Sequence, residues 1–472
     1  MRKRLLRAVA GIAIVIALLY LPECPADPPE RSDGEPFTWN QDEVWEALEA
    51  RFAAARDHGC QPFDTSVLAE RLAALDGAEP NDPRWDEWEQ SLFDLAAQTA
   101  ACPDDARALV DFYGEARTRI RQTALGWNLE ETDARQRLYR LLQGGRMAIE
   151  EVMLQMPADE MPVIVRGEDV EGAGPCTTLH DTRVCSGDIL LSRGGAPTSA
   201  LIARGSDYPG SFSHVALVHV SEDGTFRTIE AHIEVGTKIA GVETYQGDPK
   251  LRVMLLRLRP EALDDPAIPH RAASAAIAEA ASRHIPYDFA MDWDDPDKQF
   301  CSEVASTHYA NEGVHLWKGL TKTSSEGTAR WLSRFGVKRF ETHGPSDLEH
   351  DPQLAVVAEW RAPETLFQAH VDDAVVDAML EGAADGDEVG YSYARLPFAR
   401  LAKAYSWVRG LFGTAAPIPE GMSATVALRV EWLRARHRTI ADAVRAEVET
   451  FRDERGYTPP YWELVAMARR AR

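Results

Sequence analysis

The chain has 472 residues, which is too long for one ordinary hydrophobic core, so we expect two or three domains. Its 45% hydrophobic and 27% charged residues are typical of a soluble globular protein. The net charge of -24 argues against a nucleic-acid partner and gives no overall attraction to anionic lipid, because both need basic patches.

The first elements along the chain are a basic start, MRKRLLR, and a charge-free apolar run over residues 8–21. About fourteen apolar residues are fewer than the about 20 that a membrane span needs, and they suit the core of a signal peptide. We therefore expect residues 1–26 to be a signal peptide or an N-terminal membrane anchor. Cleavage after Ala26, lipidation at Cys24 and an uncleaved anchor all stay open, although Glu23 is a poor match for a lipidation site. In each case we expect an exported protein, periplasmic or anchored in the inner membrane and facing the periplasm, whose membrane association would run through the N-terminus.

Residues 36–160 have the apolar spacing of amphipathic helices, and we expect an α-helical region there. The residues that fall on single helical faces are Trp45, Leu48, Phe52 and Ala55, then Trp85, Trp88, Leu92 and Leu95. An aromatic stripe at this spacing indicates core packing rather than a ligand site.

The six cysteines are informative because disulfides are allowed in an exported protein and unpaired thiols are unusual there. The expected disulfides are Cys60–Cys102, between two helix ends, and Cys176–Cys185, a local staple. If Cys24 is removed or lipidated, Cys301 is left alone. It is then either a reactive thiol or a buried inert one, and a pairing of Cys301 with Cys24 is the further alternative.

From about Val163 the pattern changes to short β-rich runs separated by Gly, Asp and Ser turns. The expected strands and helices are 187–193, 213–220, 226–235 and 251–260, a helix near 272–283, a helix opening at 301, and an apolar run at 353–360. We expect an α+β fold in which residues 165–362 form a small antiparallel sheet packed on helices. Residues 363–472 are expected to be a C-terminal α-helical region. With no metal motif, phosphate loop or dinucleotide fingerprint, we expect no cofactor.

The hairpin at 213–234 allows a geometric prediction. The SEDGT segment suits a type I turn followed by Gly224 in the left-handed conformation as a bulge. That register places Ala216 opposite Glu230 and His214 opposite His232. Period-2 alternation then puts His214, Glu230 and His232 on one face of the sheet. A two-residue loop would instead turn Glu230 to the other face.

A Cys/His/Glu arrangement is chemically coherent. A thiol nucleophile needs a base, and the base needs a group that fixes its tautomer. At the start of a helix, Cys301 would lie near backbone N–H groups that favour the thiolate and bind an oxyanion. The structural alternatives are a half-buried strand histidine for His214 and a solvated edge carboxylate for Glu230. A metal site of His214, Glu230, His232 and Cys301 is a third interpretation, although its spacing matches no standard ligand motif.

Several short motifs occur in a recognisable order: GDILL, FSHVALV with His214, TIEA with Glu230, PYDF, and FCSEVA with Cys301. Together they resemble the circularly permuted NlpC-type papain-like cysteine hydrolases, in particular the YiiX/YebB-like group. The resemblance covers residues 176–360. The order His, acid, Cys matches the permuted arrangement, which the lecithin:retinol acyltransferase-like proteins share.

The resemblance implies that Cys301 is the nucleophile, His214 the general base and acid, and Glu230 the orienting group. It also implies that Tyr287 and Asp288 line the site, although a turn with a packed tyrosine explains them equally well. His232 is the rival to Glu230 on the same face and ranks second. We take Asp188 of GDILL as a structural residue.

The expected function is that of an exported thiol hydrolase that cleaves an amide through a thioester intermediate. Its expected partners are a peptide, a peptidoglycan fragment or an acyl-amide substrate. The alternatives are a lipid-directed thiol acyltransferase or esterase and a non-catalytic cell-envelope binding module of the same fold. An apolar, acyl-sized tunnel beside Cys301 would favour lipids, and an open polar groove would favour peptides.

Overall fold

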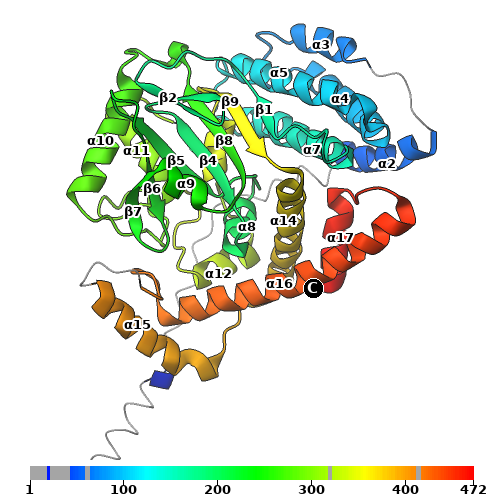
Figure 1. Ribbon diagram of the computed structural model, residues 1–472. Helices are drawn as coiled ribbons and strands as arrows, with labels where there is room; N and C mark the ends of the chain where they lie inside the picture. Colours follow the sequence, from blue (N-terminus) through cyan, green and yellow to red (C-terminus); the bar gives the residue numbers. More distant parts are fainter. Residues whose placement is uncertain (1–18, 22–42, 59–63, 317–320, 411–415) are drawn as a thin grey trace, which may run out of the picture.

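The computed structural model describes the chain except for residues 1–18, 22–42, 59–63, 317–320 and 411–415, and Figure 1 shows its arrangement. Within the described residues, seven antiparallel strands form one sheet in the order β1-β9-β8-β4-β5-β6-β7. Their bounds are β1 Ile164–Arg166, β4 Ile189–Gly194, β5 His214–Val220, β6 Phe226–His232, β7 Gly236–Gly241, β8 Lys250–Leu258 and β9 Leu354–Arg361. The β2–β3 hairpin, Cys176–Leu179 and Thr182–Cys185, stands apart as a second small sheet. The predicted α+β class is confirmed, while β1, β7 and the β2–β3 pair were not predicted.

Alternation along the strands gives the main sheet two buried faces. Leu191, Val215 and Ile229 pack against α10, Ile268–Ser282, and α11, Cys301–Asn311. The intervening residues face the other way, toward the β2–β3 hairpin and α9, Val242–Gly247. Both faces are apolar, because helices or a hairpin cover each of them.

The N-terminal helices form a layer beside the β1–β9 edge of the sheet (Figure 1). They are α2 Glu43–His58, α3 Ser66–Ala73, α4 Arg84–Ala101, α5 Ala106–Ala124, α6 Thr132–Tyr139 and α7 Gly145–Gln155. Trp85, Trp88 and Leu92 are fully buried, as the core interpretation of the aromatic stripe predicted.

Most of the remaining helices lie below the sheet in Figure 1, with the long α16 running under α8, α14 and α17, while α13 contacts β4. They are α8 Pro197–Arg204, α12 Glu326–Arg334, α13 Pro345–His350, α14 Pro363–Ala384, α15 Leu396–Gly410, α16 Ala424–Arg455 and α17 Tyr461–Ala471. One apolar core contains residues from both helical flanks, for example Phe93 of α4 and Val375 of α14. The two flanks therefore pack as one helical body around the sheet edge. Among the described helices, we find none with the length and apolar character needed to cross a membrane.

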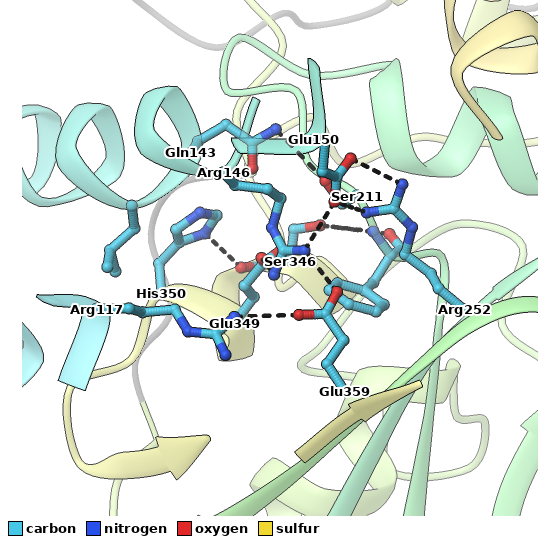
Figure 2. Close-up of polar contacts among 12 residues, drawn as sticks. Arg117, Gln143, Arg146, Glu150, Ser211, Arg252, Ser346, Glu349, His350 and Glu359 are labelled. Atoms are coloured by element: carbon cyan, nitrogen blue, oxygen red, sulfur yellow. Dashed lines mark hydrogen bonds and ion pairs between the residues drawn. The ribbon is translucent and has the colours of Figure 1, made fainter. Parts of the chain in front are cut away.

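A buried ionic network joins this helical body to the sheet, as Figure 2 shows. Arg146 of α7 lies 2.6 Å from Glu359 of β9, 2.5 Å from Glu349 of α13 and 3.2 Å from Glu150. Glu359 also pairs with Arg117 of α5 at 3.1 Å. Because all five side chains are nearly inaccessible to water, each charge depends on its partners for stabilisation.

The same network continues through Glu150 to the C-terminal helices. The Glu150 carboxylate lies 2.7 Å from Arg252 of β8 and 2.9 Å from Nε2 of His370 in α14. Six elements, α5, α7, β8, α13, β9 and α14, therefore meet in one set of charges.

Candidate active site

The β5–β6 hairpin has the predicted glycine bulge. Gly224 has a φ of +80°, and the Ser221 N–H donates to the Thr225 carbonyl at 3.1 Å. Val220 pairs with Phe226, and the ladder continues in that register to Leu217 opposite Ile229. The predicted register is confirmed, and it sets Glu230 diagonal to His214 on one face.

Glu230 lies at the centre of a polar cluster on that face. Its Oε2 lies 3.0 Å from Nε2 of His214 and 3.3 Å from Nε2 of His232. The Thr228 hydroxyl donates to the other oxygen, Oε1, at 2.6 Å. The carboxylate is 1% exposed, so these contacts hold it in one orientation.

The electrostatics of this cluster favour an ionised carboxylate. Burial alone would raise the pKa of Glu230, but its hydrogen bonds and charge interactions with His214 and His232 lower that pKa below its usual range. Glu230 therefore remains an anion wherever His214 can titrate, and it can stabilise a positive charge on the ring.

Cys301 is the first residue of α11 and follows the N-cap Phe300. It is the free cysteine in the part of the chain that the structure describes, and it is buried at 4% exposure. Its thiol lies near enough to the His214 ring to interact with it electrostatically, and this interaction raises the pKa of His214. Because Nε2 of His214 faces Glu230, Nδ1 is the nitrogen that is left for the thiol.

These partners also set the protonation of His214. Burial alone would lower the pKa of His214, but Cys301 and Glu230 more than offset that effect, and the net shift is upward. A raised pKa favours the imidazolium, which is the form that a neighbouring thiolate stabilises.

The two residues that the resemblance placed at the edge of the site differ in what they contact. Asp288 is 1% exposed, and its carboxylate accepts the N–H groups of Ala290 at 2.9 Å and Asp292 at 2.5 Å. It holds a turn, as the structural interpretation proposed. Burial and the neighbouring charges of Cys301 and Asp288 raise the pKa of Tyr287, so its hydroxyl stays protonated beside the thiol.

Tyr287 also lines an apolar pocket of about 410 Å³. Its other walls come from α8, α12, the loop that precedes α16, and α16 itself, with Ile202, Phe335, Met422 and Val426 as examples. The loop approaches closely, since a Cβ at Gly421 would lie 2.9 Å from the Phe289 ring. This pocket could not be predicted from the sequence, because nothing in the local pattern places residues 416–434 beside Tyr287.

The other cysteine predictions have separate outcomes. Cys176 and Cys185 are disulfide-bonded with an S–S distance of 2.05 Å, as predicted. Cys102 is also disulfide-bonded, but its expected partner Cys60 lies outside the described residues, as does Cys24.

Asp188 has the structural role that was expected of it. It is buried, lies 2.8 Å from Arg257 and accepts the N–H of Cys185 at 2.7 Å.

The donor atoms of His214, Glu230 and His232 all lie within 4.8 Å of one another, so this group could hold a metal ion. The metal site suggested by the sequence also included Cys301, but Cys301 is not part of this group. Binding a metal there would compete with the His214–Glu230 contact.

A permuted papain-like fold with a cysteine near a histidine–carboxylate pair is the arrangement of cysteine amidases and peptidases. Residues 183–358 match the family model for permuted papain-like amidase enzymes of the YaeF/YiiX type. This part of the chain is therefore a permuted papain-like domain of the YiiX-like group, and its enzyme class is that of a cysteine amide hydrolase.

A solved structure is also similar to part of the chain. It is described as the metalloprotein yiiX from Escherichia coli O157:H7, with 20% sequence identity and a TM-score of 0.31. The similarity covers 37% of this chain and 97% of that one. No curated protein gave a significant match.

Proposed function

We propose that the protein is an exported thiol amidase in which Cys301, His214 and Glu230 act together. The observation that carries the proposal is that His214 lies 3.0 Å from the Glu230 carboxylate and interacts electrostatically with the Cys301 thiol. In the proposed reaction, the Cys301 sulfur attacks the amide carbonyl carbon while His214 holds the thiol proton. His214 then gives this proton to the leaving amine, and a thioester remains on Cys301.

Water completes the proposed cycle. His214 takes a proton from the water as the hydroxyl attacks the thioester, and the carboxylic acid and the free thiol are released. The backbone N–H groups at the start of α11 are positioned to stabilise the oxyanion of each tetrahedral intermediate. Glu230 fixes the ring of His214 and stabilises the imidazolium throughout.

Alkylation of Cys301 tests the dyad without knowledge of the substrate. We expect iodoacetamide to label the wild-type protein at pH 6, where an isolated thiol is largely protonated. His214→Ala should remove this reactivity at pH 6 and leave labelling at pH 9 nearly unchanged, because only the acidic range depends on the imidazolium. Mass spectrometry of the peptide that contains residue 301 gives the rate.

The control for this experiment is Cys301→Ser, which should remove the labelled peptide at both pH values. Equal labelling of the wild type and His214→Ala at pH 6 would contradict the dyad. Stoichiometric zinc in the purified protein, with labelling that appears only after chelation, would favour the metal site instead.

The apolar pocket favours an acyl-amino conjugate over a peptidoglycan peptide as the substrate. Tyr287 lies near enough to Cys301 for their charges to interact, and it also lines the pocket, so an acyl group bound there would lie on the side of the pocket nearest Cys301. A group the size of a water molecule or a methylene occupies about 30 Å³, so the pocket volume of about 410 Å³ holds roughly a dozen methylene groups. A lipid-directed acyltransferase would use the same pocket. Transfer of the acyl group from the thioester to an added amine, in competition with water, would reveal acyltransferase activity.

We expect kcat/KM to rise with acyl chain length in a series of N-acyl amino acids. Each buried methylene contributes about 0.8 kcal/mol, which is roughly fourfold in kcat/KM. Val426→Trp should fill the pocket and lower kcat/KM for a dodecanoyl substrate by at least about tenfold, with little change for an acetyl substrate. Hydrolysis rates over the series measure this.

Val163→Trp is the matched control, because Val163 is exposed and does not line the pocket. Faster cleavage of a peptidoglycan stem peptide than of any acyl amino acid would contradict the assignment of substrate class.

A further inference from the structure

The α15 region differs in charge from the rest of the chain. Residues 391–410, YSYARLPFARLAKAYSWVRG, contain no aspartate or glutamate, in a chain whose net charge is -24. They contain four basic residues and five aromatic ones. The overall charge therefore conceals one segment that is basic and aromatic together.

The apolar residues of this helix point to solvent along one stripe. Phe398, Leu401, Tyr405 and Val408 are 72%, 57%, 54% and 44% exposed. Their spacing of three, four and three residues puts them on one face, at about 100° per residue. The other side of the helix is the buried one, where Leu396 and Ala399 pack against the start of α16. Single exposed apolar residues are ordinary, but a continuous exposed stripe indicates a contact surface.

Basic side chains lie on both sides of the stripe. By the same helical spacing, Arg400 falls on one side of it and Arg409 on the other. Trp407, which is 68% exposed, lies next to Arg400 around the helix. Apolar residues between arginines, with tyrosine and tryptophan at the margins, are the pattern of helices that lie in a membrane interface.

The end of the N-terminal apolar stretch contacts this helix. The Tyr20 and Tyr393 rings are 5.6 Å apart, and the Tyr393 hydroxyl donates to the Tyr20 carbonyl at 2.6 Å. The Arg400 guanidinium donates to the Leu21 carbonyl. Figure 1 shows this short N-terminal segment next to α15, away from the sheet. The charge-free run at 8–21 therefore ends at Tyr393 and at Arg400, the basic residue on one side of the stripe.

We propose that α15 is a membrane-interface helix, with its apolar stripe in the acyl-chain region and Arg400 and Arg409 at anionic headgroups. A bilayer accounts for three observations together: the apolar stripe, the basic residues beside it and the adjoining apolar N-terminal stretch. A protein partner would account for the stripe alone. The stripe on α15 is a surface separate from the N-terminal stretch, because the stripe residues Phe398, Leu401, Tyr405 and Val408 are themselves exposed to solvent.

Quenching of tryptophan fluorescence by brominated lipid tests this proposal on the full chain. The vesicles contain phosphatidylcholine and phosphatidylglycerol, with acyl chains either brominated or unmodified. We expect Trp407→Phe to remove a measurable part of the quenching. Trp293→Phe is the matched control, since Trp293 is also half-exposed but lies in the acidic segment MDWDDPDK. If the two variants lose the same quenching, α15 does not contact the bilayer and the proposal fails.

A second variant separates α15 from the N-terminal stretch. Phe398→Asp combined with Leu401→Asp should abolish the Trp407 component, while circular dichroism stays unchanged because both side chains face solvent. Unchanged quenching in this variant would overturn the role of the stripe. Vesicles of phosphatidylcholine alone should give weaker quenching of Trp407, and equal quenching would overturn the role of the arginines.

Discussion

Cys301→Ala is expected to lower kcat for amide hydrolysis by a factor of about 10⁴ or more, because no other group can form the thioester. Cys301 lies at the first position of α11, where it interacts electrostatically with His214, and it is the free thiol among the described residues. The fluorogenic amide or acyl amino acid that the wild type cleaves fastest provides the assay. Mass spectrometry after rapid acid quenching should detect an acyl adduct on Cys301 in the wild type. The variant should show no such adduct.

The graded effects of the neighbouring residues distinguish their roles. His214→Ala should lose nearly as much activity as Cys301→Ala, since it removes the group that holds and returns the proton. Glu230→Gln should lose less, because the amide can still orient the ring but cannot stabilise its charge. His232→Ala should lose least, since His232 acts on the site through Glu230, whose Oε2 lies 3.3 Å from its Nε2. A larger loss for His232→Ala than for Glu230→Gln would make His232 the third member.

The pH dependence of kcat/KM follows from the state of His214. The pKa of His214 is raised above its usual value of 6.5, so the imidazolium is present below that raised pKa and is lost as the pH rises through it. The alkaline limb of the profile should therefore lie above pH 6.5 in the wild type and shift down in Glu230→Gln. An alkaline limb that does not move would show that Glu230 does not stabilise the ring.

The sequence could predict the geometry of the hairpin because its causes are local. A glycine at the position that needs a positive φ fixes the loop, the loop fixes the register, and the two-residue period of a strand fixes the face. These steps place His214, Glu230 and His232 together without any long-range information. The start of a helix at Cys301 was also predictable from local pattern.

The pocket and the ionic network could not be predicted in this way, because both depend on contacts between distant segments. Met422 and Val426 meet Tyr287 only after α16 has packed under the sheet, and the spacing of their own helix gives no sign of it. The pair Arg146 and Glu359 is separated by 213 residues. In the sequence, each of these charges is equally consistent with an ordinary solvated face.

Arg146→Met is expected to lower the free energy of unfolding by about 3–5 kcal/mol, the usual cost of removing one partner from a buried ion pair. Burial alone would lower the pKa of Arg146, but Glu349, Glu359 and Glu150 raise it, so the guanidinium is strongly stabilised by these three carboxylates. Without Arg146, Glu349 loses the ion pair that it makes within the described residues. Arg107→Met is the control, because the Arg107–Asp111 pair is exposed and should contribute no more than about 1 kcal/mol.

The loss should depend on pH in a direction that the carboxylates determine. The pKa of Glu359 is lowered by Arg146, Arg361 and Arg117, against the opposing effect of burial. The stability that Glu359 contributes is therefore present above its usual pKa of 4.5 and is lost as the pH falls further. The difference between the wild type and Arg146→Met should accordingly be largest near pH 7 and shrink as the pH falls below 4.5 toward the lowered pKa of Glu359, because Glu359 then becomes protonated in the unfolded chain and in the variant. Urea unfolding, followed by circular dichroism at pH 7 and again below pH 4.5, measures this difference in the free energy of unfolding. A loss below about 1 kcal/mol at pH 7 would mean that water or a rearranged Arg117 compensates the carboxylates, and the network would then not be what joins the helical body to the sheet.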